Sequence, residues 1–371
     1  MCIRDSNPSV LDGLVELINA DARPRVRELG GIGTGDLSAL AQVALALCGE
    51  QATDGASVPP IRFGAGDALP LLSSNAATIA DAALAWTDLH RLAEAALVVA
   101  AISFGAVRGN AEAFDPAVAS ASAFPGVREV VRVFGPLIRS GPKAARLQDA
   151  YAFRALPQVH GAFLDALTRL GGVSEAMANA ASENPLIRPD AGSVATGVLH
   201  HGGFHAAQLA QALDAVNTAL VPAARLGLTR LTALSDPRVT GATPFLADDI
   251  PGSSGVMMLE YVAASALGEL LAQPVETQSV TLSLGAEEGA NFAPAAARAA
   301  LRAAEAYAVV IAAELVAAVR ATRMLGGPGS GRLADVLAAC AGLSAQLTDR
   351  DLSADLDTAV ALLPSLSQFA I

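Results

Sequence analysis

Long apolar patterns with helical spacing, broken only at Pro and Gly, constrain the fold of this chain more than any other feature of its 371 residues. Hydrophobic residues make up 53% of the sequence and much of that is alanine, whereas aromatic residues make up only 4%. Alanine has the highest helix propensity, and the β-branched and aromatic runs that favour strands are scarce. We therefore predict an all-α fold.

The predicted helices follow one another along most of the chain. They cover residues 9–19, 36–49, 75–107, 126–139, 143–155, 159–181, 205–222, 254–273, 293–325, 333–345 and 354–363. Helices of this length joined by short loops predict a bundle of antiparallel neighbours.

Charge and cysteine content exclude several kinds of partner. The net charge is −12 and there is no cluster of Lys and Arg, which argues against nucleic acid. The cysteines, Cys2, Cys48 and Cys340, have neither the spacing of metal ligands nor an even number. This usage is typical of a reducing compartment, so we expect a cytoplasmic protein that binds no metal.

The high mean hydropathy of +0.44 raises the question of a membrane. The most apolar stretch, residues 95–107, is interrupted by Ser103 and falls short of the roughly 18 uninterrupted apolar residues of a membrane span. We therefore predict no membrane partner and expect the excess apolar surface to be buried between subunits.

Residues 30–41 form a glycine-rich loop that runs directly into an amphipathic helix. Its glycines can take positive φ values and let peptide groups pack closely; they are Gly30, Gly31, Gly33 and Gly35. Within residues 30–36, Thr34 carries the only side-chain hydroxyl, and Asp36 is a good N-cap for the helix that follows. The loop is thus predicted to lie at a positive helix end, where developing negative charge is stabilised.

This loop has two other interpretations. One is a tight helix-entry turn without chemistry. The other is a nucleotide-binding turn, which is excluded because Asp36 occupies the place of the last glycine in Gly-x-Gly-x-x-Gly and no strand precedes the loop.

A second segment, residues 147–161, carries three polar side chains at spacings of three, namely Gln148, Tyr151 and Arg154. On a helix they would lie within about 120° of arc, because each step of three falls about 60° short of a full turn. Pro157 removes an amide donor, so we expect the helix to kink or end one turn past Arg154. The three groups are predicted to face one cavity, with a solvated helix face as the alternative.

These two segments resemble the histidine and phenylalanine ammonia-lyase family, in which an Ala-Ser-Gly tripeptide cyclises and loses water to give a methylidene-imidazolone electrophile. Residues 147–161 resemble the family's Val-Gln-Asp-x-Tyr-Ser-x-Arg-Cys-x-Pro-Gln-Val block over nearly their full length. Further matching blocks keep the family's order: residues 68–78, 182–187, 202–205 and 278–288. The resemblance spans about residues 8–371.

The resemblance implies a long-helix bundle of the ammonia-lyase (L-aspartase/fumarase-like) type and a homotetramer whose sites are assembled from several subunits. It implies a small-molecule amino acid as the substrate, and loss of ammonia from histidine or another aromatic L-amino acid to leave an acrylate. The 4-methylidene-imidazol-5-one group would form from the chain itself, by attack of the Gly35 nitrogen on the Gly33 carbonyl and loss of the Thr34 hydroxyl. No metal is implied.

The same resemblance implies a role for each matching residue. The catalytic residues would be Gly33, Thr34, Gly35 and Tyr151, and the substrate-binding residues Ser73, Gln148, Arg154, Phe204 and Glu288. Gln148 is expected to hydrogen-bond the prosthetic ring, and Glu288 to contact the amine or side chain of the substrate. Arg154 is expected to pair with the substrate carboxylate, which suits its planar guanidinium.

The chain also departs from the family pattern. The family's serine is Thr34, its asparagines are Ser73 and Gly203, the glycine loop is one residue shorter, and the Asp-His pair after Glu288 is absent. An alternative hypothesis is therefore a catalytically impaired paralogue that serves as an oligomeric scaffold. A fumarase or argininosuccinate lyase-type enzyme is a further alternative, because residues 251–258 resemble the start of its serine loop, although the Lys and Asn of that loop are missing.

The first residues need separate treatment. Residues 1–6 resemble translated sequencing-adapter sequence, and we exclude them from the fold. We expect residues 7–371 to form one ammonia-lyase-like helical domain. In the family a substantial helical segment precedes the glycine loop, so we expect a native N-terminal lid that carries a base tyrosine to be missing.

Overall fold

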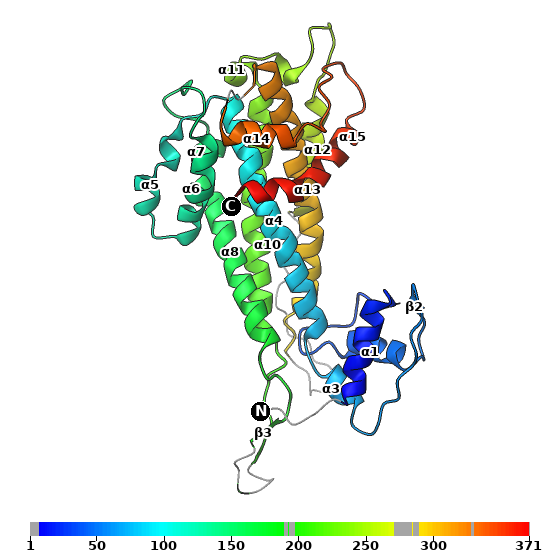
Figure 1. Ribbon diagram of the computed structural model, residues 1–371. Helices are drawn as coiled ribbons and strands as arrows, with labels where there is room; N and C mark the ends of the chain where they lie inside the picture. Colours follow the sequence, from blue (N-terminus) through cyan, green and yellow to red (C-terminus); the bar gives the residue numbers. More distant parts are fainter. Residues whose placement is uncertain are drawn as a thin grey trace. The chain divides into compact units, whose positions relative to one another are not determined.

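The structure is a computed structural model that describes residues 7–188, 192, 197–270, 284, 289–327 and 330–370, and it confirms the predicted helical fold (Figure 1). The chain forms two compact units. The loop unit comprises Met1–Leu84, Leu170–Asp214 and Val275–Ala299, and the bundle unit comprises Ala85–Arg169, Ala215–Pro274 and Ala300–Ile371. The long helices α4 (Ala76–Ala106), α8 (Leu156–Ala178), α10 (Ala207–Ser235) and α13 (Ala293–Met324) contribute residues to both units.

In the bundle unit the long helices run side by side (Figure 1). Side chains join them across the bundle: the Trp86 indole of α4 donates to the Leu167 carbonyl of α8 at 2.9 Å, and Arg230 of α10 pairs with Glu314 of α13. The shorter elements of this unit are η1 (Ala111–Phe114), α5 (Pro116–Ser120), α6 (Pro125–Ile138), α7 (Tyr151–Arg154), α11 (Pro237–Thr240), η2 (Pro244–Leu246), α12 (Met257–Leu270), α14 (Arg332–Ala339), α15 (Ser353–Leu366) and η4 (Ser367–Ala370).

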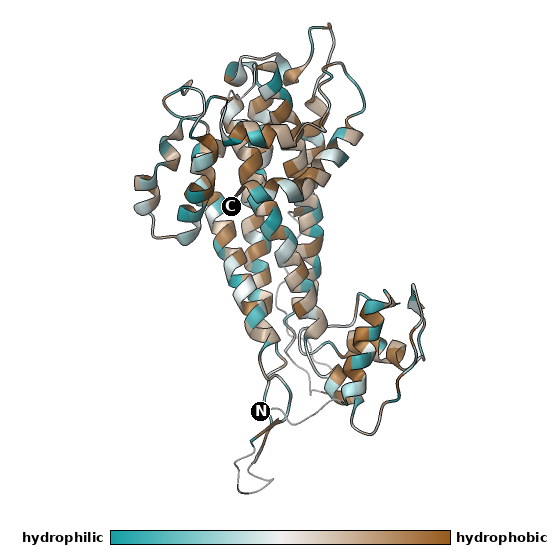
Figure 2. Ribbon diagram, viewed as in Figure 1, coloured by the Kyte–Doolittle hydropathy of each residue, from teal (hydrophilic) through white to brown (hydrophobic). Residues whose placement is uncertain are grey.

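Hydrophobic residues recur along all of the long bundle helices, with hydrophilic residues among them (Figure 2). Residues 95–102 of α4 are eight consecutive positions, and none is more than 3% exposed. A helix that is hydrophobic on all sides is one that neighbours surround. Small alanine side chains on α4 and α13 allow the close packing that the composition predicted.

Four phenylalanines tie the shorter helices to the bundle. The Phe104 ring of α4 meets Phe114, Phe134 and Phe153 edge-on, with centroid distances of 5.5, 5.6 and 6.4 Å. Phe153 belongs to α7, so this cluster fixes the short helix that also carries two predicted site residues.

The loop unit contains α1 (Pro8–Asn19), α2 (Leu37–Leu47), α3 (Ala68–Leu72) and the start of α4. A hydrophobic cluster of Val10, Leu17, Ala22 and Leu47 joins α1 to α2. Two antiparallel strand pairs complete the unit, β1 (Arg23–Pro24) with β2 (Thr53–Asp54) and β3 (Leu186–Ile187) with β4 (Val198–Leu199). The sequence did not predict these two-residue strands.

Most predicted helices are confirmed, one is shorter than predicted because α14 ends at Ala339 rather than at residue 345, and two were wrong. Residues 143–155 are helical only in α7, because side chains bind the preceding segment to distant backbone groups: the Asp149 carboxylate accepts from the Asn110 N–H at 2.6 Å, and Arg146 donates to the Val107 and Val239 carbonyls. The helix predicted to end at residue 222 continues to Ser235 as α10, through Pro222. Leu220, Ala223 and Ala224 are buried around this proline, and their packing outweighs the lost helix bond.

One stretch, Ala68–Ala106, has the length and hydropathy of a membrane span within the described part of the chain. In its most apolar window 72% of the residues are buried inside the protein, as in the core helix of a bundle.

Candidate active site

The glycine-rich loop of the loop unit has the backbone conformation that its glycines predicted. Gly30, Gly33 and Gly35 have φ values of +147°, +92° and +115°. At Gly33 a close contact adds to this requirement, because a Cβ there would lie 1.9 Å from the Asn291 Oδ1 atom. A side chain at position 33 is therefore excluded twice, by backbone conformation and by space.

Hydrogen bonds hold the two residues that precede Thr34 in the loop. The Ile32 carbonyl accepts from the N–H groups of Asn291 and Phe292 at 3.1 and 3.0 Å. The Gly33 carbonyl accepts from the Ala206 N–H at 2.9 Å and from the Asn291 Nδ2 at 2.7 Å. Thr34 itself is half-buried and directly follows these anchored residues.

Asp36 anchors the end of the loop, but not as the sequence predicted. It occupies the N-cap position of α2, yet its side chain makes no bond to that helix. Its carboxylate instead accepts from the N–H and the hydroxyl of Thr78, both at 2.7 Å, in the first turn of α4. Asp36 is 2% exposed, so this buried carboxylate stabilises the start of a different helix from the one expected.

Within the loop unit, three segments of the predicted site come together. The Asp36 N–H donates to the Ser74 carbonyl, next to Ser73, at 2.8 Å. The Asn75 side chain donates to the Phe204 carbonyl at 2.9 Å. Gly33–Thr34–Gly35 therefore shares its surroundings with the segments that carry Ser73 and Phe204. Glu288 lies outside the described residues.

The remaining predicted residues belong to the bundle unit. Tyr151 and Arg154 lie on α7, with the Arg154 guanidinium carbon 4.1 Å from the centroid of the Tyr151 ring. The Arg154 Nε is buried and has no hydrogen-bond partner among the described residues. Tyr151 is 67% exposed. A cation stacked on an aromatic ring with an unused donor is suited to bind a carboxylate.

Gln148 differs from its prediction. It precedes α7 in an exposed bend, so the three polar side chains do not share one helix face. The reason is the one given above for residues 143–150, whose backbone is held by Arg146 and Asp149 rather than by helical bonds.

The bundle unit also contains a buried polar network that the sequence did not reveal. The Arg230 guanidinium donates to both Glu314 carboxylate oxygens, at 2.7 and 2.8 Å, and the Ser103 hydroxyl donates to the same carboxylate at 2.7 Å. Arg230 also donates to the Ala152 carbonyl of α7 at 3.3 Å. This network therefore connects α4, α10 and α13 to the short helix that carries Tyr151 and Arg154.

His160 is a core histidine and is 1% exposed. Burial, with the nearby Arg230 charge, lowers the pKa of His160 to about 3, so its ring is neutral. The ring Nε2 lies 2.9 Å from the Ala93 carbonyl, which requires it to be the protonated nitrogen. The described residues contain no group of three or more His, Cys, Asp or Glu placed to bind a metal ion.

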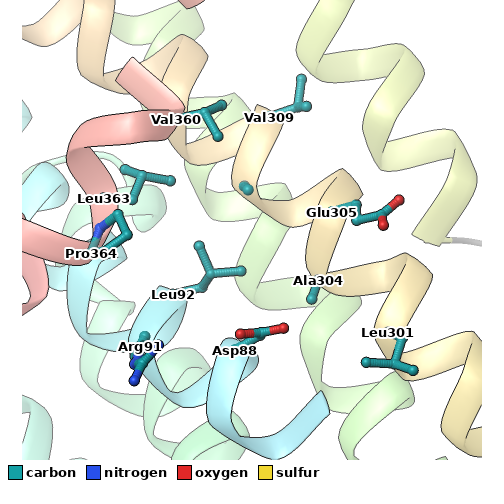
Figure 3. Close-up of a pocket in the computed structure, with 11 residues that line it drawn as sticks. Asp88, Arg91, Leu92, Leu301, Ala304, Glu305, Val309, Val360, Leu363 and Pro364 are labelled. Carbon is teal, nitrogen blue, oxygen red and sulfur yellow. The ribbon is translucent and has the colours of Figure 1, made fainter. Parts of the chain in front are cut away.

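A cavity of about 410 Å³ lies between α4, α13 and α15 in the bundle unit (Figure 3). Its wall is mainly aliphatic, including Leu92, Leu301 and Leu363, and its charged members are Asp88, Arg91 and Glu305. None of the predicted site residues lines it, so it is separate from the candidate site.

Comparison with known proteins agrees with the fold and with the family resemblance of the sequence. A family model described as aromatic amino acid lyase matches residues 6–341. The chain is 33% identical to histidine ammonia-lyase of Geobacillus thermodenitrificans over 341 residues, covering 86% of this chain and 67% of that protein. It is also 33% identical to histidine ammonia-lyase of Gloeobacter violaceus over 381 residues, covering 96% and 73%.

Solved structures show the same fold. Histidine ammonia-lyase from Trypanosoma cruzi superposes with a TM-score of 0.87 at 24% identity, covering 98% of this chain and 73% of that one. Tyrosine aminomutase from Streptomyces globisporus gives a TM-score of 0.86 at 25% identity, covering 98% and 76%. This chain belongs to the aromatic amino acid lyase family. It is therefore a carbon–nitrogen lyase, of the class that eliminates ammonia.

Proposed function

We propose that this lyase removes ammonia from L-histidine or a related aromatic L-amino acid, with an electrophile formed from Gly33, Thr34 and Gly35. The observation that carries the proposal is the conformation of the loop, in which glycines with positive φ flank Thr34 and hydrogen bonds hold the Gly33 carbonyl. The names of the relatives support histidine as the first substrate to test.

The residues of the loop fit a prosthetic ring made from the chain. Ring closure needs a nitrogen without a bulky neighbour, a carbonyl that can be attacked and a β-hydroxyl that can leave; Gly35, Gly33 and Thr34 provide these in order. When formed, a methylidene-imidazolone supplies an electrophilic carbon for the substrate. With threonine in place of serine, that carbon carries a methyl group, which crowds the approach of the substrate.

The substrate carboxylate would be held by Arg154. Its free Nε and planar guanidinium allow a bidentate, charge-assisted contact, and the Tyr151 ring fixes the guanidinium plane. Gln148, Ser73, Phe204 and Glu288 complete the proposed binding residues. We further propose a homotetramer, which would let loops and α7 helices of different subunits form one site, and a cytoplasmic location, which the cysteine usage supports.

The carboxylate contact can be tested with substrates that differ only in that group. The wild-type chain should bind L-histidine and discriminate against histamine, which lacks the carboxylate. Arg154→Ala should lower kcat/KM for histidine by about 10- to 150-fold, because a hydrogen-bonded ion contact contributes about 1.5–3 kcal/mol. Histamine binding should not change in that variant. Equal binding of histidine by wild type and Arg154→Ala would contradict the assignment.

The scaffold hypothesis remains the second candidate, and Thr34 is the residue that favours it. It requires that the loop does not cyclise or dehydrate, and that the protein removes ammonia from no amino acid. Both are measured in the experiments below.

A further inference from the structure

The Gly33 carbonyl oxygen receives two N–H donors, from the Ala206 backbone at 2.9 Å and from the Asn291 side chain at 2.7 Å. We propose that Asn291 is a positioning residue which, together with the Ala206 N–H, polarises this carbonyl and stabilises the negative charge that develops on it when the Gly35 nitrogen attacks. This inference rests on the proposed ring-forming role of the loop.

The orientation of the Asn291 amide is fixed by its contact with the start of α13; its Nδ2 also lies 3.4 Å from the His205 Nδ1. Its Oδ1 accepts from the Ala293 N–H at 3.0 Å, at the start of α13. Because only the oxygen can accept that bond, the Nδ2 group must face Gly33. Asn291 is 1% exposed, so no water competes for its donors. The helix start thus holds the amide in one orientation before any chemistry begins.

Asn291 and Gly33 are also matched in shape. The 1.9 Å separation between a Cβ at position 33 and the Asn291 Oδ1 means that this amide reaches the carbonyl only because position 33 is glycine. The family has alanine in the corresponding tripeptide, and here a glycine at position 33 accompanies an asparagine at position 291. The glycine at position 33 and the asparagine at position 291 are therefore both needed for this hydrogen bond. Neither the loop motif nor the α13 sequence indicates the bond by itself.

The chemistry balances without an oxidant or another reactant. The Gly35 nitrogen forms a bond to the Gly33 carbonyl carbon, the π electrons of the carbonyl move to its oxygen, and the amide proton of Gly35 is transferred to that oxygen. The resulting hydroxyl leaves as water with the Thr34 N–H proton, which gives a C=N bond. The Thr34 hydroxyl and its Cα hydrogen leave as a second water. Two N–H donors stabilise the first, negatively charged stage in the manner of an oxyanion hole.

The sharpest variant is Asn291→Asp, which preserves the shape of the side chain. One carboxylate oxygen still accepts from the Ala293 N–H, whereas the other now presents a negative acceptor to the Gly33 oxygen. Asn291→Ser is the second variant, because a serine hydroxyl can also accept from the Ala293 N–H but is too short to reach the Gly33 carbonyl. The matched control is His160→Gln in the bundle unit: His160 is also buried, and its ring also donates to a backbone carbonyl, that of Ala93.

The measurement is the mass of the loop peptide, sampled over time after cell-free synthesis of the chain, with circular dichroism as the check on folding. The wild type and His160→Gln should lose two water molecules at the same rate. Both Asn291 variants should lose water about 10²–10³-fold more slowly, the usual effect of removing one oxyanion donor. A folded Asn291→Asp or Asn291→Ser chain that loses water at the wild-type rate overturns the inference.

Failure of the proposed function gives a different pattern. If the loop loses water in an Asn291-dependent manner and no amino acid then loses ammonia, the inference stands and the proposed activity is wrong. If the wild-type loop never loses water, ring formation is wrong and both are overturned.

Discussion

The buried pair of Arg230 and Glu314 should be the most sensitive ionic contact in the bundle unit. Its side chains are 3% and 1% exposed, and both carboxylate oxygens are within 2.8 Å of the guanidinium. Removing one partner leaves an uncompensated charge in a dry interior. We expect Arg230→Met to lower the free energy of unfolding by about 3–5 kcal/mol, since this is the usual cost of breaking a buried pair from one side.

The double variant Arg230→Met/Glu314→Leu should recover most of that loss, because apolar residues of similar volume remove both charges together. The Ser103 hydroxyl would keep an acceptor in the double variant, since it also lies 3.3 Å from the Val99 carbonyl. The matched control is Arg132→Met. Arg132 pairs with Glu129 at 2.6 and 2.8 Å, a similar geometry, but these side chains are 58% and 46% exposed.

Urea unfolding followed by circular dichroism measures all of these variants. Arg132→Met should cost less than about 1 kcal/mol, as exposed pairs do. The reasoning is refuted if Arg230→Met costs no more than Arg132→Met. It is also refuted if the double variant is less stable than Arg230→Met alone.

Three further predictions concern the loop and the core. Thr34→Ser should raise acrylate formation, because it removes the methyl group from the carbon that the substrate attacks and leaves Gly33 and Gly35 unchanged; equal rates would contradict this account of crowding. Gly33→Ala should abolish water loss from the loop peptide in mass spectrometry, since its Cβ would meet the Asn291 amide, and an alanine chain that still cyclises would show that the contact is dispensable. His160 has a folded-state pKa of about 3, below its ordinary 6.5, so the unfolded chain binds more protons between these values and stability falls as pH decreases from about 6.5 towards 3. The free energy of unfolding, measured by urea titration, should fall by up to about 1.4 kcal/mol per pH unit because of His160, and this contribution should disappear in His160→Gln. An equally steep fall in that variant would show that other groups cause the pH dependence.

The sequence predicted the helices well where burial is continuous. The helix expected over residues 75–107 is α4, and the one expected over residues 293–325 is α13, each within one residue at either end. Both are apolar enough that no competing local structure arises. Segments held by distant side chains were not predictable in this way, because Asp149 and Arg146 bind backbone groups that lie up to 93 positions away in the chain.

In the candidate site, too, features that depend on local sequence were predicted, and features that depend on distant contacts were not. The glycine pattern predicted the positive φ values around Thr34, because the requirement is local. Asp36 was identified as a helix cap, but which helix it caps depends on tertiary contact with Thr78. Asn291 was missed altogether. An asparagine two residues before a helix is typical of a side chain that accepts from the first helical N–H, and this pattern carries no information about the loop that lies 258 positions earlier in the chain.

The central claim is that this chain eliminates ammonia from an aromatic L-amino acid. The most direct test is incubation of the purified chain with L-histidine labelled with ¹⁵N at the α-amino group, with parallel reactions on phenylalanine and tyrosine. We predict that labelled ammonium and the corresponding acrylate appear in equal amounts, and that Arg154→Ala suppresses both. Absence of labelled ammonium and of acrylate from all three amino acids, in a chain whose folding is confirmed by circular dichroism, would contradict the claim.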